Sequence, residues 1–196
     1  MLSEPVAIPF PKLSMSARSA SGFSSGGITF FATDQNDLTF AIRYQPSIQP
    51  LFNALQSSLQ DVQAVEVAQS SDTVTVTFDN EILFASGSAN VAHAGEAVIG
   101  EIAPHLKTLE GFQVVISGHT DNNPIRGQLQ SRFPSNWELS AMRAVNVTRA
   151  LQDAGIPGAM LKAEALGEYS PKNSNATDAE RQANRRTEIR IEPLAD

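Results

Sequence analysis

The sequence predicts an α+β fold of two layers, in which a mixed β-sheet is covered by helices. Three observations support this prediction. Strand-like and helix-like segments alternate from residue 71 to the end of the chain, a pattern typical of a sheet packed against helices. Hydrophobic residues make up 41% of the 196 residues, which is enough for a packed core. The chain has no cysteine, so this core forms without disulfides.

Two segments precede the predicted domain, which we place at residues 71–196. Residues 1–27 are rich in Ser, Gly and Pro and predict a flexible linker. Within residues 28–70, the apolar runs Ile28–Ala32 and Leu38–Tyr44 predict a hairpin. Apolar residues at three- and four-residue steps from Ile48 to Val62 then predict an amphipathic helix. This helix either lies on a neighbouring core or makes a dimer contact.

The elements of the predicted domain follow from local patterns. Strict alternation or short apolar runs predict strands, and Ser or Thr followed three residues later by Glu predicts a helix start. Gly111 and Gly155 are typical of helix ends. The predicted elements are the strands Thr73–Phe78, Gln113–Ser117, Lys162–Leu166 and Thr187–Ile191, the helices Val91–Leu109 and Asn136–Ala154, and a short helix after the capping box of Thr177 and Glu180.

The charge balance excludes one class of partner. The chain carries 14 Lys and Arg against 21 Asp and Glu, a formal net charge of −7. Nucleic-acid binders present a basic face that neutralises phosphates, so no nucleic-acid partner is expected.

Two opposite charges are the candidate functional residues. Helical periodicity places Arg143 on the apolar face of its helix, where a guanidinium is costly unless it meets a carboxylate or lines a polar cavity. Asp121 follows the strand Gln113–Ser117, where side chains leave the sheet. The two either form an internal salt bridge or bind a zwitterionic ligand, with Arg143 on its carboxylate and Asp121 on its ammonium.

Three motifs resemble the OmpA-type peptidoglycan-binding domain over about residues 78–192. They are Ser117-Gly118-His119-Thr120-Asp121, the run from Asn136 to Ala144 (NWELSAMRA), and Asn184-Arg185-Arg186-Thr187-Glu188-Ile189. Within that superfamily, Asn122-Asn123-Pro124-Ile125 and the run from Arg132 to Ser140 look like the flagellar stator B subunits, the MotB/PomB group. The sodium-driven PomB branch is the preferred member.

The resemblance implies a non-catalytic function, the anchoring of an ion-driven flagellar stator to the cell wall. Residues matching Asp121 and Arg143 would hold the meso-diaminopimelate of a peptidoglycan stem peptide. Asn136 and Leu139 would shape the site, with Thr120 and Arg186 beside it. It implies no cofactor and no metal.

The resemblance also implies a location and partners. The chain would be the periplasmic part of a single-pass inner-membrane protein, without its membrane segment. Its partners would be a second copy in a homodimer, a MotA/PomA-type A subunit, and basal-body ring proteins. Two wall-binding domains on one stator would raise the effective concentration of each.

Other functions fit the sequence less well. A hydrolase triad would use the residue types of Ser117, His119 and Asp121, but alternate residues of one extended segment do not give the geometry of a triad. His93, His105 and His119 lack metal-ligand spacing, and His119 is expected to be a turn residue bonded to backbone. The basic cluster Arg181, Arg185, Arg186 and Arg190 is expected to be a solvated helix end. A passive cell-envelope tether, as in OmpA and Pal, is the alternative.

Overall fold

β-Strands in two separate sheets form the frame of the chain. The computed structural model describes residues 24–25, 28–32, 40–44 and 48–194, and their side chains from residue 48 onward. The chain divides into two compact units, residues 1–45 and 46–196. Most of the predicted linker, residues 1–23 and 26–27, lies outside the described residues. Among the described helices, none combines the length and the apolar character needed to cross a membrane.

The first unit contains a small antiparallel sheet. Its strands are β1 (Ser24–Ser25), β2 (Ile28–Ala32) and β3 (Phe40–Tyr44), in the order β1-β2-β3. β2 and β3 pair from Ile28 with Tyr44 to Ala32 with Phe40. This is the pairing that the two apolar runs predict, although the turn between them lies outside the described residues.

The second unit is built on a five-stranded mixed sheet, as expected from the alternating pattern. The strand order is β4-β5-β8-β6-β7, and only β6 and β7 run parallel. A parallel pair needs a long crossover connection, and here that connection contains the helix α4 (Asn136–Asp153). The strands are β4 (Val65–Ser70), β5 (Thr73–Asp79), β6 (Phe112–His119), β7 (Leu161–Gly167) and β8 (Arg186–Pro193).

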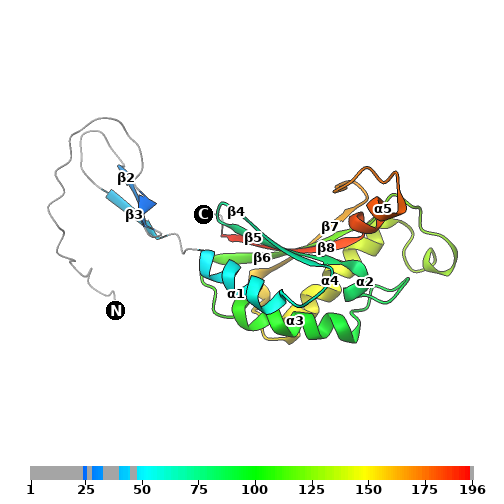
Figure 1. Cartoon of the computed structure of the whole chain (residues 1–196), viewed down its shortest axis with the longest axis horizontal. Helices are drawn as coiled ribbons and strands as arrows, with labels where there is room; N and C mark the ends of the chain where they lie inside the picture. The colour runs from blue at the N-terminus through cyan, green and yellow to red at the C-terminus, as the bar shows by residue number, and fades with distance from the viewer. Residues whose placement is uncertain (1–23, 26–27, 33–39, 45–47, 195–196) are drawn as a thin grey trace. The chain divides into compact units, whose positions relative to one another are not determined.

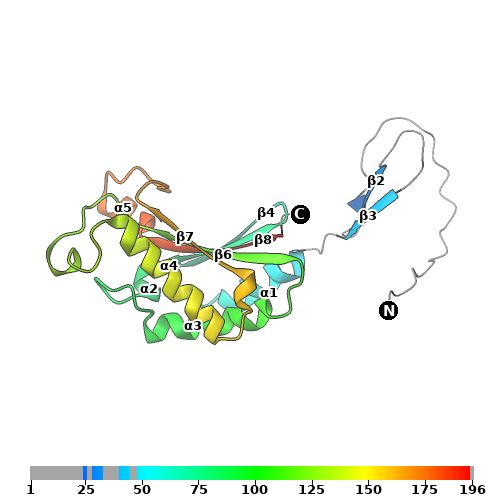
Figure 2. The ribbon, with the colours of Figure 1, turned by 180° about the vertical axis from the view of Figure 1, so that it is seen from behind.

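Helices cover one face of this sheet and form the second layer. Figures 1 and 2 show α1 (Gln49–Leu59), α3 (His93–Leu106) and α4 on the same side of the strands. The remaining helices are α2 (Asn80–Leu83) and α5 (Asp178–Asn184), with 3-10 turns at Gly127–Leu129 and Gly158–Met160. The predicted α+β architecture of two layers is confirmed.

The core lies between the two layers. In β5, the buried residues Val74, Val76 and Phe78 alternate with half-buried threonines, because successive side chains of a strand point to opposite faces. Ile116 and Ile189 continue this apolar face on β6 and β8, and the helices close it from the other side.

The compact unit begins earlier than the predicted boundary at residue 71. Leu51, Leu55 and Leu59 of α1 are buried in the main core. β4 was not predicted, yet it pairs along its whole length with β5. Its alternation of Val65 and Val67 with polar and small residues is a weak strand signal, and it is the partner strand that fixes the conformation. The predicted amphipathic helix therefore lies on the core of the same unit.

A close contact between α4 and β6 positions the end of the sheet where the candidate residues lie. A Cβ atom at Gly118 would lie 2.3 Å from the carbonyl oxygen of Ser140, so only glycine allows this approach. The Ser140 hydroxyl also accepts a hydrogen bond from the Gly167 amide at 3.1 Å. α4 is thus held against both parallel strands.

We predict that Gly118→Ala destabilises the domain by at least about 2 kcal/mol, because the added methyl group meets rigid backbone. Gly100→Ala is the matched control: Gly100 lies in α3 with nothing within 4 Å of its added Cβ. That substitution should stabilise by up to about 1 kcal/mol, since alanine favours helix more than glycine does. Denaturant unfolding measures both. Equal stability of the two variants would show that the contact is not tight.

Candidate functional site

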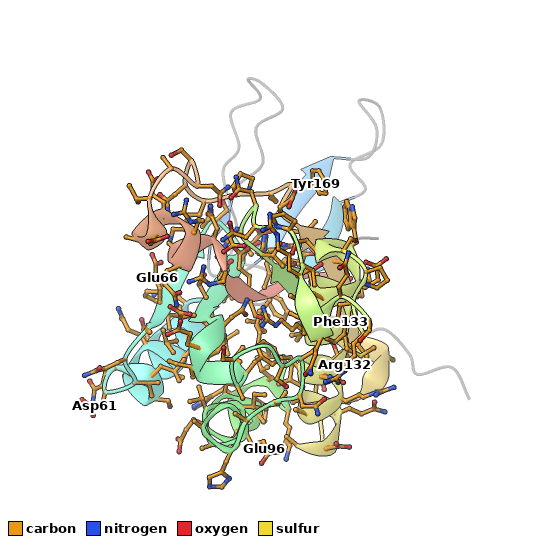
Figure 3. All side chains as sticks on the ribbon, turned by 90° about the vertical axis from the view of Figure 1, so that its right-hand side faces the viewer. Asp61, Glu66, Glu96, Arg132, Phe133 and Tyr169 are labelled. Atoms are coloured by element: carbon orange, nitrogen blue, oxygen red, sulfur yellow. The ribbon has the colours of Figure 1, made fainter. Side chains whose placement is uncertain are left out.

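Asp121, Asn136, Arg143 and Arg185 form the candidate site, which we call the Asp121 site. They come from three parts of the chain: Asp121 follows β6, Asn136 and Arg143 belong to α4, and Arg185 caps α5. The capping box of Ser135 and Glu138 starts α4, as predicted, and so fixes where Asn136 lies. Figure 3 views the domain from the end at which α5 lies, with Tyr169 and Phe133 labelled.

The Asp121 carboxylate is 6% exposed and almost fully hydrogen-bonded. Its Oδ1 accepts from the Asn123 amide at 3.1 Å, and its Oδ2 accepts from Asn123 Nδ2 at 3.1 Å. Oδ2 also accepts from Arg185 Nη1 at 2.6 Å in an ion pair. A carboxylate has about four lone-pair positions. Three are used within the described residues, which leaves Oδ1 with room for one more donor.

The Arg143 guanidinium is also buried, at 7% exposed. Its Nε and Nη2 both donate to the Ser88 carbonyl oxygen, at 3.2 and 3.1 Å, and its carbon lies 5.1 Å from the centre of the Phe84 ring. Burial, and then the charge of Arg185, lower the pKa of Arg143 to about 10, while Asp121 opposes them. Arg143 therefore stays charged at neutral pH, and three of its five N–H groups make no hydrogen bond within the described residues.

The two predicted charges lie in one electrostatic environment but are not partners of each other. Asp121 raises the pKa of Arg143, yet the described ion pair of Asp121 is with Arg185. Our expectation that Arg185 is part of a solvated helix end is therefore wrong. Its side chain is 34% exposed and lies over the carboxylate. The sequence signal that could have indicated Arg185 is its place in the Asn184-Arg185-Arg186 motif.

Asn136 connects the site to the loop after β7. Its Nδ2 lies within hydrogen-bond distance of three acceptors, the carbonyl oxygens of Asp121 and Asn123 and Oε2 of Glu168, at 3.3, 3.1 and 2.6 Å. Leu139 packs nearby in a small apolar cluster with Ala89 and Phe133. The structure thus brings Asp121 into contact with Asn136 and close enough to Arg143 to raise its pKa, while Leu139 is part of the same helix.

Arg186 directly follows Arg185, but its described hydrogen bonds are to residues outside the Asp121 site. Its Nε donates to Glu188 Oε1 at 2.6 Å and its Nη2 to the Ser170 carbonyl oxygen at 3.2 Å. It lines a shallow cavity of about 230 Å³ that Asp121, Asn136 and Arg143 do not line. Thr120 is adjacent to Asp121 and buried, and its hydroxyl has no hydrogen-bond partner within the described residues.

His119 differs from its expected role as a turn residue. It ends β6, is 2% exposed, and its ring nitrogens make no hydrogen bond within the described residues. Burial, and then the positive charge of Arg186, lower its pKa from 6.5 to about 4. The neighbouring Glu188, whose Oε1 lies 3.8 Å from the His119 Nε2, opposes this shift.

The lowered pKa of His119 predicts a loss of stability in acid. Below pH 6.5 the unfolded chain binds a proton that the folded chain refuses until about pH 4, so the free energy of unfolding falls as the pH drops through this window. The His119 contribution has a slope of up to about 1.4 kcal/mol per pH unit. His119→Gln should remove it, with the exposed His93→Gln as the substitution control. Parallel stability curves for wild type and His119→Gln between pH 6.5 and 4 would contradict this.

Comparison with known proteins identifies the family. Residues 83–185, just over half of the chain, match the OmpA family. Motility protein B of Bacillus subtilis is 37% identical over 130 residues, which are 66% of this chain and 49% of that protein. The chain therefore spans about half the length of this curated relative.

Two solved structures share the fold. A putative MotB-like protein from Desulfovibrio vulgaris has a TM-score of 0.68 and 29% identity, covering 76% of this chain and 92% of that one. The cell wall anchor of the type VI secretion system (T6SS) from Pseudomonas aeruginosa has a TM-score of 0.64 and 35% identity, covering 71% and 97%. The chain belongs to the OmpA family, as the three sequence motifs indicate, and is a homologue of motility protein B.

Proposed function

We propose that this domain binds peptidoglycan without catalysis and anchors a flagellar stator of the MotB/PomB type to the cell wall. The names of its relatives support both parts, since one is a motility protein and another is a cell wall anchor. A stator that turns a rotor must itself be held in place, and the wall outside the inner membrane can hold it. The resemblance to stator B subunits extends the proposal to a homodimer that works with an A subunit and with basal-body ring proteins. It also extends the proposal to sodium as the coupling ion.

The observation that carries the proposal is the unused hydrogen-bonding capacity of the Asp121 site. Asp121 Oδ1 has room for one donor, and Arg143 keeps three N–H groups, two of which form a fork suited to a carboxylate. A ligand that carries an ammonium and a carboxylate on one carbon complements both. The free end of meso-diaminopimelate in a stem peptide has this chemistry.

Burial makes the binding of a charged ligand at this site insensitive to salt. Both charges are less than a tenth exposed, so an ion pair with a ligand is only weakly screened by salt. The ligand reaches Asp121 beside Arg185, whose partly exposed side chain can move at little cost. The net charge of −7 gives no general attraction to an anionic wall polymer, so the affinity must arise from these local contacts.

Asp121→Asn and Arg143→Ala should each weaken binding to purified cell-wall sacculi at least tenfold. A hydrogen bond to a charged group contributes about 1.5–3 kcal/mol, and about 1.4 kcal/mol is tenfold in affinity. Co-sedimentation measures binding, and thermal unfolding checks the fold. Arg149→Ala, at an exposed arginine of the same helix, is the matched control and should bind as wild type does. Unchanged binding by both site variants would remove the basis of the proposal.

A cell-envelope tether without a motor role is the second candidate, favoured by the 35% identity to the T6SS cell wall anchor. Swimming separates the two. In the source bacterium, a chromosomal Arg143→Ala substitution should abolish or strongly reduce swimming while flagella are still assembled, because an unanchored stator transmits no torque. Normal swimming together with lost wall binding would favour the tether.

A further inference from the structure

Two exposed aromatic side chains are stacked on each other near the Asp121 site. Among the described residues, four large apolar side chains are exposed: Trp137, Met142, Tyr169 and Leu194. Trp137 is 45% exposed and Tyr169 is 65% exposed, yet their ring centres are 5.0 Å apart with an interplanar angle of 21°. We call them the aromatic pair. Two stacked aromatic rings with exposed faces offer a small apolar surface on which a ligand can pack.

Backbone hydrogen bonds hold the two segments that carry the aromatic pair. Trp137 lies in the first turn of α4, and its amide donates to the capping Ser135 hydroxyl at 3.2 Å. Tyr169 follows a turn after β7, where its amide donates to the Leu166 carbonyl oxygen at 3.1 Å and Gly167 has φ +53°. These bonds hold the backbone on which each ring is carried, and the rings stack on each other without a ligand, which lowers the entropy cost of binding.

The aromatic pair is continuous with the Asp121 site. Asn136 precedes Trp137 and Glu168 precedes Tyr169. Asn136 Nδ2 donates a hydrogen bond to Glu168 Oε2 at 2.6 Å. The same Asn136 nitrogen lies 3.3 Å from the Asp121 carbonyl oxygen. The two rings are therefore carried by the residues that follow Asn136 and Glu168, next to the Asp121 site, and Tyr169 is labelled in Figure 3.

We propose that the aromatic pair binds a pyranose ring of the glycan strand while the Asp121 site holds the attached stem peptide, an inference that rests on the proposed function. A pyranose ring presents a face of C–H groups that packs on an aromatic face, while its hydroxyl groups stay in water. The free end of diaminopimelate is joined to the sugar through its own side chain, γ-linked D-Glu, L-Ala and a lactyl group, a longer path than the roughly 7 Å of two extended residues. A bent stem peptide of this length lets the sugar reach the aromatic pair next to the Asp121 site.

The small size of the patch favours a sugar over a protein partner. A stable protein interface buries about 800 Å² on each side, which two side chains do not provide. A sugar ring is uncharged and of the same size as an aromatic ring, so it matches an apolar surface that carries no charge of its own. The aromatic pair would select wall fragments that carry both sugar and peptide.

The single tryptophan of the chain makes this testable, because Trp137 is the only source of tryptophan fluorescence. The whole chain is titrated with the stem peptide L-Ala-γ-D-Glu-meso-diaminopimelate, with the N-acetylglucosamine–N-acetylmuramic acid disaccharide, and with the two joined. The joined ligand should change the fluorescence and bind about tenfold more tightly than the free peptide.

Trp137→Ala and Tyr169→Ala, measured by calorimetry, should lose this tenfold advantage and leave the affinity for the free peptide unchanged. Tyr169→Phe keeps the ring and should keep the advantage. Met142→Ala, which removes another exposed apolar side chain of α4, is the matched control.

Each contrary result has a distinct meaning. An undiminished advantage in Trp137→Ala and Tyr169→Ala would overturn the sugar assignment and leave the proposed function intact. An equal loss for free peptide and joined ligand would also overturn it, since the rings would then belong to the peptide site. If wild type binds neither free peptide nor joined ligand, the proposed function itself fails.

Discussion

The close packing of α4 against β6 is the constraint on which the functional end of the molecule depends. Gly118 has no side chain, so the backbone of α4 at Ser140 reaches the strand directly. The Ser140 hydroxyl joins the helix to β7 at Gly167. Asn136 lies one turn before this contact and Arg143 one turn after it. Their distance from the end of β6, and so from Asp121, is fixed by a contact that itself binds nothing.

Charge burial explains why the Asp121 site is suited to recognition. A buried ion is stable only when its hydrogen-bonding groups find partners. Asn123 and Arg185 occupy three acceptor positions of Asp121, whereas the Ser88 carbonyl accepts from only two of the five N–H groups of Arg143. The remaining capacity is an acceptor position on Asp121 and three donors on Arg143. A zwitterion completes both sets at once, whereas a simple cation or anion completes only one.

The sequence predicted most of the second unit because its signals are local. The capping boxes at Ser135 and Thr177 formed as expected, since each joins residues only three positions apart. The alternation of Thr73–Phe78 became β5. In contrast, β4 was missed, and the place of α1 was left open between a core and a dimer contact, because both depend on partners far along the chain.

The elements with local signals, the family, and Asp121, Asn136 and Arg143 as candidate site residues could therefore be predicted from the sequence alone. Which groups meet at the site depends on the tertiary structure. Arg185 rather than Arg143 pairs with Asp121 across 64 residues, Arg186 turns to Glu188, and Trp137 stacks on Tyr169. Such contacts depend on how helices and loops pack in three dimensions, and periodicity along a single segment carries no information about them.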